Sequence, residues 1–132
     1  MARGGLDYEG IAAVYATFQA DGSVSSVMLA SGVAAVEGKA VTIVGNKIAG
    51  YGSAGDTLLG RIDTYENDHY MTVQTGGFST MPGVSGSLPT AGDFLVVDGS
   101  GAVQASTGAV GPARAISVDN TANVNNVMVL IC

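Results

Sequence analysis

Cysteine is almost absent from this sequence of 132 residues, in which Cys132 is the single one. The chain therefore has no internal disulfide, and its fold must be held by packing alone. We interpret Cys132 as a small apolar side chain that ends a strand. Long apolar runs are missing too: residues 24–36, the longest weakly apolar stretch, fall short of the roughly 18 residues of a membrane span. With no signal-peptide pattern at its start, the sequence predicts a soluble protein made in the cytoplasm, without a membrane partner.

Charged side chains are scarce, at 12% of residues, and the 5 basic residues face 11 acidic ones for a formal net charge of −6. A protein that binds phosphate backbones needs clustered Lys and Arg, whereas the basic residues here are scattered singly. The sequence therefore argues against direct nucleic-acid binding. A mean hydropathy of +0.37 leaves much neutral, apolar surface for so small a chain, which predicts an oligomer or a large partner.

Recognisable catalytic, cofactor and metal patterns are also missing. His69 is the sole histidine, and no nucleophile or metal ligand stands at a recognisable spacing from it, so we interpret it as a surface or edge residue. The acids between residues 63 and 68 lack the regular spacing of a calcium loop. No glycine-rich segment carries the Lys-Ser/Thr pair that holds phosphate. We therefore predict no metal site, no cofactor and no enzymatic activity.

One short sequence, Asp98-Gly99-Ser100, follows an apolar strand as the catalytic acid of an aspartic protease does. Those enzymes have Asp-Thr/Ser-Gly, whereas glycine comes first here, and a half-site would also have to dimerise about the acid. A hairpin turn, which favours Asp-Gly for its backbone angles, is the better interpretation.

Glycine is abundant instead, with 20 residues, and the phrase small-Ala-Gly-Asp-any-Leu occurs twice, at residues 53–58 and 90–95. Each copy is typical of a turn that leads into a strand: the glycine permits a positive φ, the aspartate can cap the backbone two residues on, and the apolar residue starts a buried alternation. Long polar helix formers are too few to cover several amphipathic helices.

The spacing of short apolar runs predicts an all-β chain. We expect strands at residues 11–18, 24–29, 40–44, 47–51, 57–63, 69–75, 94–97, 102–105, 113–118 and 126–131. Gly76-Gly77 is expected to end a strand and residues 78–89 to form a loop. The pattern favours one core, a small β-sandwich or partly open β-barrel with an extended N-terminal arm over the first ten residues. We divide the chain into residues 1–29, the arm and first strands, and residues 30–132, the β-rich domain.

Several phrases, taken in order from about residue 30 to residue 131, resemble one protein family. They are Ser53-Ala54-Gly55-Asp56 with Leu59-Gly60-Arg61-Ile62, then residues 71–78 (MTVQTGGF), then Ala91-Gly92-Asp93 with residues 97–103 (VDGSGAV), and finally residues 111–116 (GPARAI) before a Val-rich end. In this order they resemble the bacteriophage capsid decoration, or head cement, proteins. The first 30 residues are longer than the pattern of that family, which leaves the mode of attachment open.

The resemblance implies a structural virion protein without enzymatic activity, which binds the outer surface of an assembled phage head across capsomer boundaries. It also implies an all-β fold, a homotrimer, the major capsid protein as partner and an N-terminal arm that reaches the shell. We therefore expect the contacts with the shell or with sister subunits to come from the arm and from the loop at residues 78–84. The expected interface residues are Leu6, Tyr8, Ile11, Phe78, Met81, Pro82 and Val84.

An alternative function is a receptor- or glycan-binding module of a phage fibre or tail, which is also β-rich and trimeric. Sugar sites usually use exposed aromatic side chains. The chain has no Trp and five tyrosines, Tyr8, Tyr15, Tyr51, Tyr65 and Tyr70, so this function rests on little sequence support.

Overall fold

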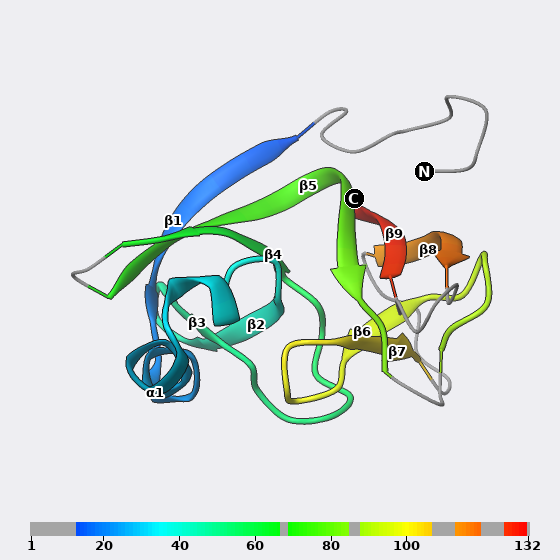
Figure 1. Cartoon of the computed structure of the whole chain (residues 1–132). Coiled ribbons are helices and arrows are strands. Elements are labelled where there is room, and N and C mark those ends of the chain that lie inside the picture. The colour runs from blue at the N-terminus through cyan, green and yellow to red at the C-terminus, as the bar shows by residue number, and fades with distance from the viewer. Residues whose placement is uncertain (1–12, 67–68, 85–87, 107–112, 120–125, 132) are drawn as a thin grey trace.

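The computed structural model describes residues 13–66, 69–84, 88–106, 113–119 and 126–131 (Figure 1). Strand predominates, at 53% against 14% helix, which confirms the predicted all-β class. The elements are β1 (Val14–Ala20), α1 (Gly22–Ser31), the 3-10 turn η1 (Val33–Ala35), β2 (Ala40–Gly45), β3 (Ile48–Gly50), β4 (Gly60–Tyr65), β5 (Tyr70–Pro82), β6 (Leu95–Val97), β7 (Val103–Ala105), β8 (Ala113–Asp119) and β9 (Asn126–Ile131). The arm expected over the first ten residues lies outside the described residues.

The first five strands close into a small barrel. Their order is β1-β3-β2-β4-β5, and β5 returns to pair with β1, as Ala16 does with Val73. Strand β1 runs parallel to β3, and the other neighbouring pairs in the barrel are antiparallel. The barrel interior is apolar, with fully buried side chains that include Val41, Ile62 and Val73. A closed barrel with extra strands agrees with the predicted small barrel or sandwich.

A second layer extends from the far half of β5. Strand β5 pairs with β9 from Gly77 onward, β9 pairs with β8, and β6 and β7 form a separate hairpin. These strands share a second apolar core, which contains Met81, Leu95 and Val127. Strand β5 thus belongs to both layers (Figure 1). Since adjacent residues of a strand point to opposite faces, Ala40 of β2 lies in the second core while Val41 lies in the barrel core.

Strand β5 bends where the two layers meet, and the bend corrects one prediction. The side-chain amide of Gln74, which is 1% exposed, donates to the carbonyl oxygens of Gly76 at 3.1 Å and Phe78 at 3.0 Å. Gly77 adopts φ +85°, a conformation that glycine tolerates. The expected end of the strand at Gly76-Gly77 and the expected loop over residues 78–82 are therefore wrong, because the two glycines turn the strand without ending it.

Helix α1 corrects a second prediction, because a strand was expected at residues 24–29. The carboxylate of Asp21 accepts from the backbone N–H groups of Ser23 at 3.0 Å and Val24 at 3.3 Å, which satisfies donors that the first turn leaves unpaired. At the other end Gly32, at φ +91°, donates its N–H to the carbonyl oxygen of Met28 at 2.8 Å. These caps fix a helix that lacks an amphipathic pattern. The boundary expected between residues 29 and 30 falls inside it.

The two Ala-Gly-Asp phrases form the predicted turns, with nearly the same geometry. Asp56 Oδ2 accepts from the N–H of Ser53 at 2.9 Å, and Asp93 Oδ2 accepts from the N–H of Thr90 at 2.8 Å. Each carboxylate therefore caps the residue three positions before it, and not the residue two positions after it as expected. Each turn is also bonded to a strand: the first exchanges backbone hydrogen bonds with Val97, the second with Ala115. Both turns thus tie separate segments of the second layer together.

Candidate functional site

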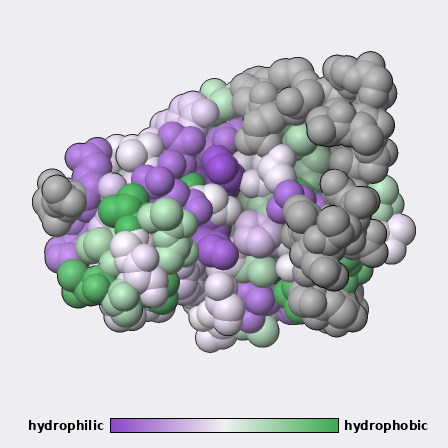
Figure 2. Space-filling model, in the orientation of Figure 1, coloured by the Kyte–Doolittle hydropathy of each residue, from purple (hydrophilic) through white to green (hydrophobic). Residues whose placement is uncertain are grey.

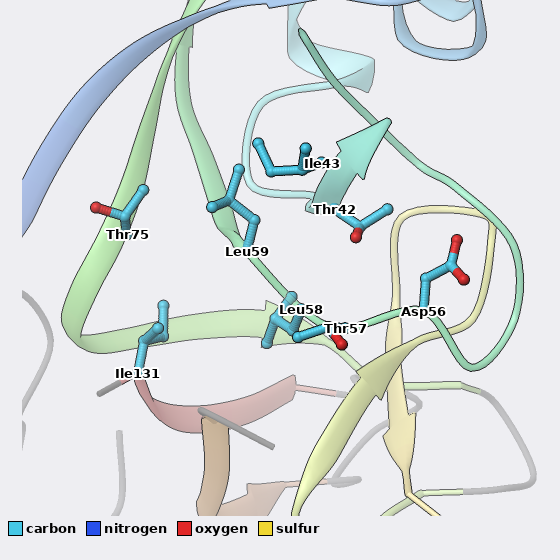
Figure 3. A pocket seen from close by; sticks show the side chains of 8 residues that line it. All are labelled: Thr42, Ile43, Asp56, Thr57, Leu58, Leu59, Thr75 and Ile131. Atoms are coloured by element: carbon cyan, nitrogen blue, oxygen red, sulfur yellow. The ribbon is translucent and has the colours of Figure 1, made fainter. Parts of the chain in front are cut away.

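An open groove lies on the inner side of the bend in β5, between the barrel and the second layer (Figure 3). Its volume is about 580 Å³, which is within the range of small-ligand sites. The residues that line it come from β2, from the segment that leads into β4, from β5 and from β9: Thr42, Ile43, Asp56, Thr57, Leu58, Leu59, Thr75 and Ile131.

The floor of the groove is aliphatic and firmly anchored. Leu58 and Ile131 are buried members of the second core, at 1% and 3% exposed, and Leu59 packs against the barrel core. The backbone N–H of Leu59 donates to the carbonyl oxygen of Val41 at 2.8 Å. Because both cores hold this floor in place, the groove is largely pre-formed, as binding sites usually are.

Polar groups stand around this floor. Hydroxyl groups come from Thr42, Thr57 and Thr75, and the one charged side chain among the lining residues is Asp56. Figure 3 shows Asp56 at one end of the groove and Thr75 at the other. The Asp56 carboxylate is held by its bond to Ser53, so its negative charge has a fixed position. An aliphatic floor with a carboxylate at one end suits an extended segment that carries apolar side chains and one cation.

Exposed apolar side chains border the groove. Ile43, which lines it, is 48% exposed, and the adjacent Val44 is 43% exposed. At the other end, the hydroxyl of Thr75 donates to the carbonyl oxygen of Val14 at 3.5 Å, and the Val14 side chain is 57% exposed. This apolar surface therefore continues beyond the groove itself.

The predicted interface residues that the structure describes lie outside the lining of this groove. Leu6, Tyr8 and Ile11 lie outside the described residues. Phe78 and Pro82 are half-buried on β5, where they pair with Leu130 and Asn126 of β9, and Val84 is half-buried just after β5.

Met81 requires a correction as an interface residue. It is fully buried in the second core, so its side chain packs within its own chain and presents nothing to a partner. The sequence suggested a surface position because residues 78–89 resemble a loop in composition. In the structure Met81 lies on β5, one residue from the end of that strand.

His69 and Asp98, which the sequence also singled out, serve local structure. The Nδ1 atom of His69 lies 2.9 Å from the hydroxyl of Tyr65, and the carbonyl oxygen of His69 accepts from the N–H of Ala20 at 2.8 Å. Asp98 Oδ1 accepts from the N–H groups of Ser100 and Ala102, at 2.7 and 3.0 Å, as a hairpin turn requires. Within the described ranges, no three His, Cys, Asp or Glu side chains are grouped to hold a metal ion.

Among the described residues, Tyr51 is the group whose pKa the fold clearly shifts. Its side chain is 6% exposed, and burial raises the pKa of the phenol, with a further rise from the negative charge of Asp21. The backbone N–H of Tyr51 donates to the hydroxyl of Ser23 at 3.1 Å. Tyr51 thus packs against the start of α1 and has no place in the groove.

The groove was not foreseen from the sequence. Its lining residues belong to separate phrases and expected strands of the sequence, and no sequence pattern brings them together. No helix among the described residues is both long enough and apolar enough to cross a membrane. No known family model matches the chain, and no curated protein matches its sequence.

Proposed function

We propose that the protein is a capsid decoration protein, which binds the outer surface of an assembled phage head and stabilises it across capsomer boundaries. Its partners are then the major capsid protein and two further copies of itself, and its location is the exterior of the virion. The observation that carries this proposal is the apolar surface that a single folded chain leaves exposed. A small chain with few charges rarely keeps such surface without a partner.

Three parts of the molecule contribute this surface. On β1, Val14 and Tyr15 are 57% and 50% exposed, and Ile43 and Val44 stand at the end of β2. On α1, Leu29 is 73% exposed, in a stretch of 15 residues, 22–36, that contains no charged side chain. Apolar side chains reach the surface around α1, at the lower left of Figure 2. Neutral surface of this kind allows close contact between molecules that each carry a net charge of −6.

The physical role suits a rigid β-rich chain. A clamp that binds the assembled shell and not the free subunits stabilises the assembled state by selective binding. Many weak contacts repeated around a shell are enough for that purpose. The N-terminal segment adds a route to affinity, because an extended segment can join the edge of a shell sheet through main-chain hydrogen bonds.

Co-sedimentation with expanded heads, built from the major capsid protein of the same genome, tests this function. The full chain is expected to bind to saturation at a fixed ratio of copies to capsid subunits. Removal of residues 1–10 is expected to abolish binding while the circular dichroism spectrum stays the same. A truncated chain that still coats heads at full occupancy would show that the arm is not the attachment, and a full chain that never binds would refute the decoration function.

Two exposed tyrosines favour the glycan-binding alternative as a second candidate. Tyr15 of β1 and Tyr70 of β5 are 50% and 45% exposed, and Tyr70 pairs with Gln19, four residues along β1 from Tyr15. Residues four apart on a strand share a face, so both rings belong to one outer face of the barrel. A glycan array separates the two functions: if the chain binds sugars but not heads, and Tyr15→Ala abolishes this binding, the alternative replaces the decoration function.

A further inference from the structure

The N-terminal segment, residues 1–12, is joined to β1, and β1 begins beside the groove. Strand β5 pairs with β1 as far as Gly76, opposite Val14, and with β9 from Gly77 onward, opposite Ile131. Val14 is also tied to Thr75 by the 3.5 Å hydrogen bond from the threonine hydroxyl. Since Thr75 and Ile131 both line the groove, β1 begins at that end of the groove.

The segment is long enough to fill the groove of its own chain. Ile11 is three residues before Val14, within about 10 Å of it, and twelve extended residues span at most about 40 Å. A tethered segment of this length has an effective concentration in the millimolar range, so even weak apolar contacts suffice to hold it. A neighbouring copy has no such advantage in dilute solution.

The order of apolar and basic residues along the segment matches the order of aliphatic and acidic residues along the groove. Moving away from Val14, the sequence offers the apolar residues Ile11, Tyr8 and Leu6, and then Arg3, the one basic side chain among residues 1–12. Moving away from Thr75, the groove offers its aliphatic floor and then the carboxylate of Asp56. In an extended segment Leu6 and Tyr8 share one face, while Asp7 and Glu9 share the opposite face, toward water.

We infer that the groove is the docking site of the chain's own N-terminal segment. Leu6 and Tyr8 cover the aliphatic floor, and Arg3 pairs with Asp56. The contact exists in the free chain and does not depend on the proposed function. If that function also holds, the shell has to draw the segment out of the groove before the segment can bind it.

Disulfide trapping in the absence of heads tests the inference. The full chain carries Cys132→Ser, to remove the native thiol, together with Ile43→Cys on the groove and either Leu6→Cys or Tyr8→Cys on the segment. Ile43 is 48% exposed, so its replacement leaves both cores intact. Under mild oxidation, peptide mapping of the monomer fraction is expected to show the linked peptides. The expected rate is at least about tenfold above that of a control pair in which Leu29→Cys on α1 replaces Ile43→Cys.

A second variant tests the orientation of the segment. Arg3→Glu places like charges at the Asp56 end, and it is expected to slow the trapping of Leu6→Cys with Ile43→Cys several-fold at low salt and less at high salt. The inference is overturned if both groove pairs react no faster than the Leu29→Cys control. It is also overturned if the linkage is found mainly between two chains, which would assign the groove to a second copy. Because no capsid protein is present, neither outcome bears on head binding.

Discussion

Single glycines act in two different ways in this chain. Gly55 and Gly92, in the two Ala-Gly-Asp turns, both adopt φ +96°, and a Cβ at either position would meet no atom within 4 Å. Glycine is required at these two positions because of the backbone conformation. At Gly60 the requirement is space, because a Cβ there would collide with the backbone carbonyl oxygen of Gln74 on the neighbouring strand. The sequence pattern identified the first role, whereas the second depends on a strand pairing that the sequence does not specify.

Substitution of the turn glycines should therefore have a moderate and similar effect. We expect Gly55→Ala and Gly92→Ala each to lower the free energy of unfolding by about 1–2 kcal/mol, the cost of a left-handed conformation for a residue with a Cβ. Gly60→Ala is expected to lower it by more, because the backbone of β4 must move away from β5. Urea unfolding measures all three. If all three variants lose the same free energy of unfolding, the clash between a Cβ at position 60 and β5 adds nothing to the cost of the substitution.

Ser79 carries a buried hydroxyl group without a hydrogen-bond partner among the described residues. Its side chain is fully buried on β5, and its hydroxyl has no hydrogen-bond partner within the described part of the chain. Ser79→Ala is expected to raise the free energy of unfolding by about 1 kcal/mol, since it removes an unsatisfied polar group. Gln74→Ala, which removes a buried amide that donates two hydrogen bonds, is the matched control and should lower it by about 1–3 kcal/mol. A clear loss in both variants would mean that the Ser79 hydroxyl has a partner.

The raised pKa of Tyr51 gives stability a dependence on alkaline pH. As pH rises past the ordinary tyrosine pKa of about 10, the unfolded chain loses the phenol proton before the folded chain does. The folded state then binds more protons, so the free energy of unfolding falls with rising pH. Urea midpoints across this range should fall less steeply for Tyr51→Phe than for the unchanged chain. If the urea midpoints of both proteins fall equally steeply with pH, the loss of stability at alkaline pH does not come from Tyr51.

At the scale of elements, the sequence predicted those whose signals are local. The β6–β7 hairpin, with its Asp-Gly turn, and strands β2 and β9 lie where they were expected. Helix α1 was missed because its residues are Gly, Ser, Val, Met, Leu and Ala without charges, so no polar face marks the helical period. The signal that identifies it is Asp21 as N-cap with Gly32 at its end. By itself that pattern does not specify a helix, since Asp-Gly-Ser is also typical of a turn.

The N-cap of α1, Asp21, depends on a glycine in strand β3. A Cβ on Gly50 of β3 would collide with the Asp21 carboxylate. We expect Asp21→Ala to lower the free energy of unfolding by about 1 kcal/mol, and Gly50→Ala to lower it by at least as much because it displaces the same carboxylate. In urea unfolding, Gly50→Ala should have a smaller effect when Asp21→Ala is already present. Strict additivity of the two losses would show that the positions act independently.

At the scale of the whole molecule, the groove could not be predicted from the sequence. Thr42, Leu59, Thr75 and Ile131 are distant in the chain, and only the closure of the barrel and the bend of β5 bring them together. An interface was expected at residues 78–84 because residues 78–89 have the composition of a loop. This expectation was wrong for Met81, because β5 continues through the glycines and that side chain enters the second core.

The exposed apolar surface predicts association of whole chains. In solution we expect a trimer, with a mass of three times the 13.1 kDa of one chain, measured by light scattering over a dilution series. Because the exposed side chains are neutral and each chain carries −6, added salt should maintain or strengthen the trimer by screening repulsion. A single-chain mass at every concentration would contradict a trimer in the free state, and dissociation by salt would point to ion pairs as its source.

Val14 and Ile131 face consecutive residues of one strand, Gly76 and Gly77. A short peptide linker from residue 131 to residue 14 would therefore follow a path that β5 already defines. A circularly permuted chain built in this way, and opened at an exposed turn, should keep both cores. Cargo fused at residue 14 or at residue 131 would leave the fold at the same place, which makes this end a natural point of attachment for display.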